Sequence, residues 1–178
     1  MNVSIIGSGS MGSGIAQVAA TANCKVKVFD TNPDVLAKAD KKLQKILNRL
    51  IEKGRIDETK QASILKNITY INDITEVADA DLVIEAIIEN LDIKKKVFKN
   101  IESLVSKECI LASNTSSLSI ASIAAACEHS ERVVGIHFFN PAPLMKLVEI
   151  IPAVQTSDAV LRQAKNIIDS WGKLTVLA

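Results

Sequence analysis

Three closely spaced glycines near the start of the chain constrain its fold more than any other feature. They follow the apolar run Asn2–Ile6, which predicts a buried strand, and they overlap the start of a helical pattern at Met11–Thr21. The spacing G-x-G-x-x-G permits a tight turn, brings the backbone close to a pyrophosphate, and lets the helix pack against the strand. The helix N-terminus then presents free N–H groups and the positive end of its dipole to the phosphates. The predicted cofactor-binding residues of this loop are Gly7, Gly9, Ser10, Met11 and Gly12.

An acidic residue at the end of the second predicted strand supports this interpretation over a glycine-rich turn that binds nothing. The strand Lys25–Phe29 leads into Asp30, eighteen residues after Gly12, where dinucleotide-binding units place the acid that binds the adenine ribose. A carboxylate accepts hydrogen bonds from the ribose 2′-hydroxyl but repels a 2′-phosphate. Residues 31–33 offer no arginine that would neutralise that phosphate, so the sequence predicts NAD rather than NADP as cofactor.

Short apolar runs alternate with helical patterns along the rest of the chain. Further strands are predicted at Asn67–Ile71, Asp81–Ile84, Cys109–Ala112, Val133–His137, Leu147–Ile151 and Leu174–Leu177. Further helices are predicted at Pro33–Lys53, Leu91–Leu104 and Asp158–Trp171. This alternation predicts an α/β fold of the Rossmann type, a doubly wound and mostly parallel sheet flanked by helices. No linker or repeat interrupts the pattern, so residues 1–178 are predicted to form one domain.

The helix predicted from Pro33 has a strongly basic outer face. Asn32 is suited to cap the start of this helix, and Gly54 is placed to end it. A basic helix face is most often simply solvated, but it can also form a rim that meets an anionic ligand. The residues alone leave both interpretations open for Arg49 and Lys53.

Composition places the chain among ordinary globular proteins. Its 178 residues are 48% hydrophobic and carry a formal net charge of +1, which gives no reason to expect nucleic acid or a membrane as a partner. The three cysteines are widely spaced and form neither a disulfide framework nor a metal-binding cluster, so we expect no metal and a reducing compartment. The N-terminus lacks the pattern of a signal peptide, and no apolar run is long enough to span a bilayer. These features predict a cytoplasmic protein.

A run of small polar residues, Ser113–Ser117, follows one of the predicted strands. In an open α/β sheet, ligands bind beyond the carboxyl ends of the strands, so these hydroxyls and the amide are placed to reach a ligand. Alternatively, Ser117 or Ser119 caps the short helix that contains Ile120 and Ile123. The sequence favours neither interpretation.

A histidine and a glutamate interrupt two later apolar strands. Glu149 lies within the apolar run that follows Lys146, and burying an unpaired carboxylate is costly, so we expect it to have a partner or a raised pKa. One candidate partner is Lys146, in an ordinary salt bridge, and the other is His137, twelve residues upstream. If Glu149 pairs with His137, the carboxylate would orient the imidazole and stabilise its protonated form, as a general base for alcohol oxidation requires.

Four segments of the chain resemble the L-3-hydroxyacyl-CoA dehydrogenases, with the strongest likeness to the bacterial 3-hydroxybutyryl-CoA branch of that family. They are GSGSMGSGIA, DLVIEAIIENLDIKKKVF, SNTSSLSI and HFFNPAPLMKLVEII, in matching order and spacing over essentially the whole chain. The last three together are far more specific than the glycine loop. The resemblance implies reversible oxidation of a 3-hydroxyacyl-CoA to a 3-ketoacyl-CoA while a hydride passes to NAD.

The resemblance also implies roles for individual residues. By it, His137 is the general base that takes the 3-hydroxyl proton, Glu149 is its acidic partner, and Ser116 contacts the substrate oxygen near the nicotinamide. The implied cofactor contacts downstream are Glu89, Lys94, Ser116 and Asn140. The implied contacts to the phosphates of CoA are Lys53 and Arg49.

Members of this family carry a second, helical domain that forms the dimer interface, covers the substrate and supplies a catalytic asparagine. We therefore expect this chain to be the NAD-binding domain of a longer homo-oligomeric enzyme, and by itself to bind NAD with little turnover. Two other functions stay open. One is an NAD-binding module without catalysis, and the other is a related dehydrogenase of a 3-hydroxy acid that carries no CoA.

Overall fold

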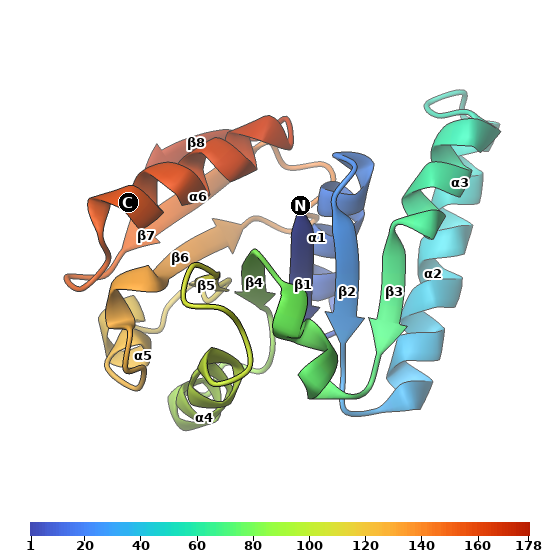
Figure 1. Cartoon of the computed structure of the whole chain (residues 1–178). Coiled ribbons are helices and arrows are strands. Elements are labelled where there is room, and N and C mark those ends of the chain that lie inside the picture. The colour runs from blue at the N-terminus through green and yellow to red at the C-terminus, as the bar shows by residue number, and fades with distance from the viewer.

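The computed structural model describes the whole chain, Met1–Ala178, as one twisted sheet with helices packed against it (Figure 1). The strands are β1 (Asn2–Ile6), β2 (Lys25–Phe29), β3 (Ile68–Ile71), β4 (Leu82–Glu85), β5 (Ile110–Ser113), β6 (Val133–Phe138), β7 (Leu147–Pro152) and β8 (Leu174–Leu177). The α-helices are α1 (Ser10–Thr21), α2 (Pro33–Glu52), α3 (Glu58–Lys66), α4 (Leu91–Glu102), α5 (Ile120–Ala124) and α6 (Asp158–Ser170). Two short 3-10 helices are η1 (Ile74–Asp79) and η2 (Ser130–Arg132).

The strand order is β3-β2-β1-β4-β5-β6-β7-β8. Strands β1 to β6 pair in parallel, and only β7 and β8, which are parallel to each other, run in the opposite direction. The chain passes from β1 outward to β3, then crosses to β4 on the other side of β1. The carboxyl ends of β1 and β4 therefore flank the point where the winding reverses, which is where open α/β sheets bind ligands.

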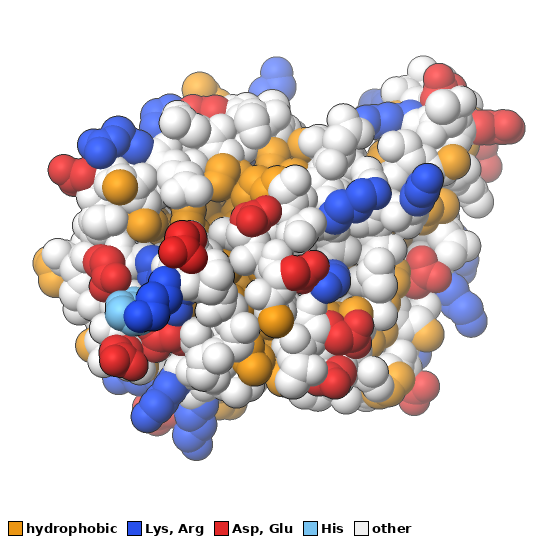
Figure 2. Space-filling view, in the orientation of Figure 1, with side chains coloured by type: hydrophobic (Ala, Val, Ile, Leu, Met, Phe, Trp, Pro, Cys, Tyr) orange, Lys and Arg blue, Asp and Glu red, His pale blue; other side chains and the backbone are white.

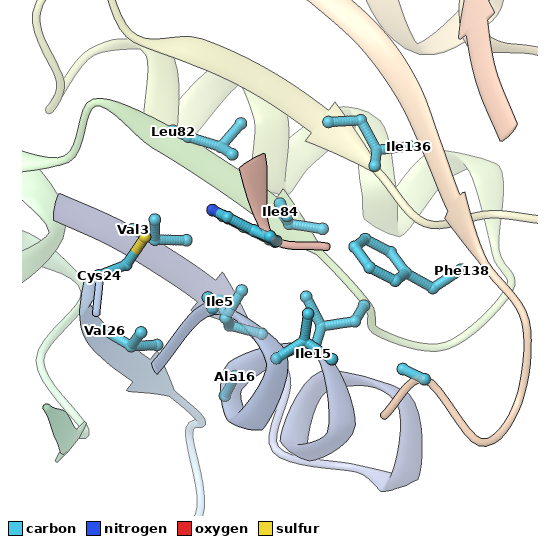
Figure 3. Packing of buried hydrophobic residues seen from close by; sticks show 14 of the residues in the cluster. Val3, Ile5, Ile15, Ala16, Cys24, Val26, Leu82, Ile84, Ile136 and Phe138 are labelled. Atoms are coloured by element: carbon cyan, nitrogen blue, oxygen red, sulfur yellow. The ribbon is translucent and has the colours of Figure 1, made fainter. Parts of the chain in front are cut away.

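Two hydrophobic cores cover the two faces of the sheet. The larger core joins the central strands to α1, α2, α3 and α6, and the smaller one joins them to α4 and α5. The larger core includes Ile15 of α1 together with Ile84 and Phe138, which come from the carboxyl-terminal parts of β4 and β6 (Figure 3). This packing holds the ends of strands that are far apart in the sequence in one rigid layer.

The predicted fold class is confirmed, and every predicted strand and helix is found with its ends shifted by no more than two residues. Asn32 caps α2 by accepting a hydrogen bond from the N–H of Asp34, and Gly54 adopts a φ of +64° directly after the helix ends. One helix was missed, because the segment that forms α3 buries only Ile64 and therefore shows little apolar periodicity. Its capping residue, Asp57, which accepts a hydrogen bond from the N–H of Lys60, was the signal that could have revealed it.

The surface carries charges of both signs. Figure 2 shows acidic and basic side chains interspersed on one face rather than gathered by sign, in keeping with the net charge of +1. None of the helices is both long enough and apolar enough to cross a membrane.

Candidate functional site

The loop between β1 and α1 has room for a ligand but not for side chains at two of its glycines. Gly7 has a φ of +104°, and a Cβ there would lie 2.7 Å from the carbonyl oxygen of Ala86. A Cβ on Gly12 would lie 1.9 Å from the carbonyl oxygen of Gly7. A Cβ on Gly9 would meet nothing within 4 Å, and no side chain caps the N-terminus of α1. The open space at Gly9 and the uncapped N–H groups of the first turn, which includes Ser10 and Met11, fit the pyrophosphate of a dinucleotide.

Asp30 lies beside this loop at the carboxyl end of β2. Its Oδ2 accepts hydrogen bonds from the N–H and the hydroxyl of Ser8, at 3.1 and 2.7 Å, and its Oδ1 accepts one from the N–H of Asn32. Partial burial acts to raise the pKa of Asp30, but the hydrogen bonds from Ser8 and Asn32 outweigh it, so the pKa is lowered below the usual range. The carboxylate is therefore ionised and fixed in place. Ser8 was missed in the sequence, although it stands within the glycine motif.

Glu89 lies in the connection between β4 and α4, on the other side of β1 from Asp30. Its Oε1 accepts hydrogen bonds from the hydroxyl of Thr115 and the N–H of Ser116, and its Oε2 lies 3.1 Å from the ammonium of Lys94. Burial acts to raise the pKa of Glu89, but these three partners lower it overall. Glu89 remains 43% exposed at the site, whereas Lys94 is 1% exposed. The ammonium of Lys94 thus lies beneath the exposed part of the Glu89 side chain.

In and after the polar run that follows β5, different residues cap the next helix and contact Glu89. Ser119 caps α5 by accepting a hydrogen bond from the N–H of Ser122. Thr115 binds Glu89, as described above, and Ser116 is exposed at the same edge of the sheet. Asn114 supplies the side-chain amide that the sequence predicted to lie within reach of a ligand, and its oxygen makes a contact within the protein. Its side-chain oxygen accepts the N–H of Phe138 at 2.8 Å, which ties the turn after β5 to the end of β6.

His137 and Glu149 face each other across the antiparallel pair β6–β7, where they are register partners. Nδ1 of His137 lies 2.8 Å from Oε2 of Glu149, and the two side chains are 16% and 31% exposed. Glu149 therefore pairs with His137 rather than with Lys146, which is exposed. The ring of His137 also packs against Phe139, with 4.7 Å between ring centroids. This places a carboxylate-oriented imidazole at the edge of the sheet that holds the glycine loop.

The remaining candidate residues divide into two groups by position. Asn140 is exposed and lies two residues beyond the end of β6, so it is at the same end of the strands as His137. Arg49 and Lys53 are exposed at the far end of α2, which begins near Asp30 and runs about 30 Å away from that edge (Figure 1). The structure does not bring these two basic residues to the cluster. No group of three or more His, Cys, Asp or Glu side chains comes together that could hold a metal ion.

Comparison with known proteins identifies the family of the chain. Residues 2–178 match the family described as 3-hydroxyacyl-CoA dehydrogenase, NAD binding domain. A probable 3-hydroxybutyryl-CoA dehydrogenase of Bacillus subtilis is 42% identical over 98% of this chain, and the chain spans 61% of that protein's length. The crystal structure of 3-hydroxybutyryl-CoA dehydrogenase from Escherichia coli K12 superposes with a TM-score of 0.98 at 40% identity, over 99% of this chain and 38% of its own.

A third relative acts on a different class of substrate. The crystal structure of a 5-formyl-3-hydroxy-2-methylpyridine 4-carboxylic acid 5-dehydrogenase, described as an NAD+-dependent dismutase, superposes with a TM-score of 0.87 at 30% identity. The match covers 99% of this chain and 56% of that one. The family match extends over residues 2–178, on a sheet in which β1 is followed by an open glycine loop and β2 by a hydrogen-bonded carboxylate, that of Asp30. The chain therefore belongs to the family of NAD-binding domains of the 3-hydroxyacyl-CoA dehydrogenases.

Proposed function

We propose that this chain is the NAD-binding part of an enzyme that reversibly oxidises an (S)-3-hydroxyacyl-CoA, with 3-hydroxybutyryl-CoA the favoured substrate, to the 3-ketoacyl-CoA. The observation that carries the proposal is the pair His137–Glu149, 2.8 Å apart, at the sheet edge that also holds the glycine loop and Asp30. The names of the Bacillus subtilis and Escherichia coli relatives support the substrate class. The longer protein is proposed to be a homo-oligomer.

The chemistry requires a hydride acceptor, a base and a fixed geometry. NAD, which the glycine loop and Asp30 would hold, would supply the acceptor for the hydride from C3 of the substrate. Because Nδ1 of His137 donates to Glu149, Nε2 carries the free lone pair and accepts the proton of the 3-hydroxyl group. The carboxylate of Glu149 stabilises the imidazolium that results. Ser116 is proposed to contact the substrate oxygen, and its exposure on the turn after β5 supports this role.

The fixed carboxylate of Asp30 is expected to select NAD over NADP. Replacing Asp30 by alanine removes an acceptor for the ribose 2′-hydroxyl, and hydrogen bonds to charged groups are worth about 1.5–3 kcal/mol. NADH affinity should therefore fall on the order of tenfold to a hundredfold. NADPH affinity should rise, because the charge that repels the 2′-phosphate is gone. Fluorescence titrations with both cofactors measure the two effects.

Asp34 provides the control for this substitution. It is an exposed acid in the first turn of α2, only four residues from Asp30, and replacing it by alanine removes the same charge. Asp34→Ala should leave the ratio of NADH to NADPH affinity unchanged. If Asp30→Ala has the same ratio of NADH to NADPH affinity as the unaltered chain, the assignment of Asp30 to the ribose site is refuted.

Turnover is expected to need more than these 178 residues. The chain alone should bind NADH, as measured by calorimetry, but reduce acetoacetyl-CoA far more slowly than the longer protein that contains it. This expectation rests on the length of the relatives, since the chain spans 61% of the Bacillus subtilis protein. Comparable turnover by the chain alone would contradict this expectation, and absence of NADH binding would contradict the cofactor assignment.

A dehydrogenase of a 3-hydroxy acid without CoA is the second candidate. Two observations favour it: Arg49 and Lys53 lie at the end of α2 that is remote from His137, and one relative is named for a pyridine carboxylic acid. Steady-state rates of the longer protein with acetoacetyl-CoA and with free acetoacetate separate the two substrates. A module without catalysis would bind NADH but no acyl-CoA beside it.

A further inference from the structure

The connection between β6 and β7, residues 139–146, begins two residues after His137. Its inner side packs against α1, since a Cβ on Gly14 would lie 3.2 Å from the Cβ of Ala142 and 3.3 Å from the Cδ of Pro143. Helix α1 begins at the glycine loop, and β6 carries His137. The connection therefore joins the element that would hold the pyrophosphate to the element that carries the proposed base.

Two carbonyl groups of this connection have no backbone partner. The carbonyl oxygens of Ala142 and Met145 accept no backbone N–H. Ala142 is 2% exposed, so its carbonyl group needs a donor from within the protein. One side chain binds both groups: Nζ of Lys173 lies 2.6 Å from the carbonyl oxygen of Ala142 and 2.8 Å from that of Met145. Lys173 thus supplies the donors that the backbone lacks here.

Lys173 reaches the connection because of the direction of the last two strands. It lies between α6 and β8, directly before Leu174. Strands β7 and β8 run opposite to β6, so their first residues lie at the carboxyl end of β6. The N–H of Leu174 also donates to the carbonyl oxygen of Lys146, at 2.9 Å. Residues 173 and 174 therefore hold the connection by three hydrogen bonds.

An ammonium group is a costly donor at this position. Desolvation lowers the pKa of Lys173, and no carboxylate offsets that effect. In return, hydrogen bonds from a charged donor are stronger than those from a neutral one, and a single ammonium can serve two carbonyl groups at once. Lys173 is therefore suited to hold the connection in one conformation, which is more than filling space requires.

We propose that Lys173 is a positioning residue for the hydride-transfer step, a role that rests on the proposed function. It acts at a distance from His137, because β7 lies between β6 and β8. By fixing the connection, Lys173 holds the start of α1 and the end of β6 in one relative position. Misplacing reacting groups by about 1 Å costs on the order of 100-fold in rate, so Lys173 acts on the rate rather than on the affinity for the cofactor.

The test is Lys173→Met in the longer protein, which removes the ammonium and keeps a side chain of similar length. The rate of acetoacetyl-CoA reduction in a single turnover, at saturating concentrations of both ligands, should fall on the order of tenfold. The Kd for NADH should not change, because Asp30 and the glycine loop keep their own contacts. Stopped-flow absorbance gives the rate, and fluorescence titration gives the Kd.

Lys60→Met is the matched control. Like Lys173, Lys60 is partly exposed, and its Nζ donates to a carbonyl oxygen of another element, that of Thr21 at 2.8 Å. Thr21 is the last residue of α1 and lies at the end remote from the glycine loop. Lys60→Met should lower the melting temperature, as Lys173→Met does, but leave the single-turnover rate unchanged.

Gly14→Ala disturbs the same connection from its other side without removing a hydrogen bond. The added Cβ requires Ala142 and Pro143 to move by a few tenths of an ångström. The single-turnover rate should fall in the same way as in Lys173→Met, by a smaller factor, again with an unchanged Kd for NADH. Gly14→Ala decides the question if Lys173→Met does not fold.

The possible results distinguish this role from the proposed function. An unchanged rate in both Lys173→Met and Gly14→Ala would overturn the positioning role and leave the proposed function standing. An equal loss of rate in Lys60→Met and Lys173→Met would also overturn it, because a general loss of stability would then explain both. Failure of the unaltered longer protein to reduce acetoacetyl-CoA would refute the proposed function, and the positioning role with it.

Discussion

Replacing Gly12 by alanine is expected to destabilise the chain and abolish NADH binding. The added Cβ would lie 1.9 Å from the carbonyl oxygen of Gly7, a backbone atom held by the turn. Alanine favours helix by about 1 kcal/mol over glycine, but overpacking a rigid site costs about 3 kcal/mol, so the clash dominates. For a chain of this size the balance lowers Tm by roughly 4–8 °C. To relieve the clash, α1 must move away from β1, which takes its N–H groups out of reach of the pyrophosphate.

Gly9→Ala separates loss of the ligand site from loss of the fold. Gly9 has a φ of −64°, which alanine adopts readily, and a Cβ there meets nothing within 4 Å. Tm should therefore stay within about 2 °C of that of the unaltered chain. NADH affinity should nevertheless fall by about tenfold or more, because the methyl group occupies the space that the pyrophosphate needs. Tight NADH binding by Gly9→Ala would mean that the backbone does not approach a phosphate here.

The adenine side of the site could be predicted from the sequence because its residues are close together in the chain. The glycine loop joins one strand to one helix, and Asp30 ends the next strand, so local periodicity and spacing fix their positions. The same periodicity predicted every strand whose carboxyl end borders the site. Local patterns sufficed because the strands at this edge are short, buried and mostly separated by helices.

The arrangement around Lys94 depends on contacts that a linear pattern does not contain. Glu85, Lys94 and Ser113 come from three elements, and nothing in their spacing indicates that they form one buried network. Glu85 directly follows an apolar run, so the periodicity ended the strand at Ile84. A charged residue at the end of a fully apolar strand was the signal that could have drawn attention to it.

The partner of Glu149 was undecided in the sequence for a related reason. Residues 139–146 form a long connection, and only tight two-residue turns fix the register of an antiparallel pair from the sequence. A shift of one residue would have turned Glu149 to the opposite face of the sheet. The observed register puts Glu149 directly opposite His137. The assignment of the base therefore depends on tertiary structure rather than on the residues alone.

Replacing His137 by glutamine should lower the rate of acetoacetyl-CoA reduction in the longer protein by a factor of about 100–10,000, the usual contribution of a general acid–base group. The amide retains a hydrogen-bonding side chain opposite Glu149 but cannot exchange the proton of the 3-hydroxyl group. NADH affinity should not change, because Asp30 and the glycine loop are untouched.

Glu149→Gln, which keeps an acceptor for Nδ1 but loses the charge that stabilises the imidazolium, should give an intermediate rate. The rate at which NADH absorbance is lost under single-turnover conditions measures the chemical step in each variant. A rate for His137→Gln close to that of the unaltered protein would exclude His137 as the base, whatever the rate of Glu149→Gln.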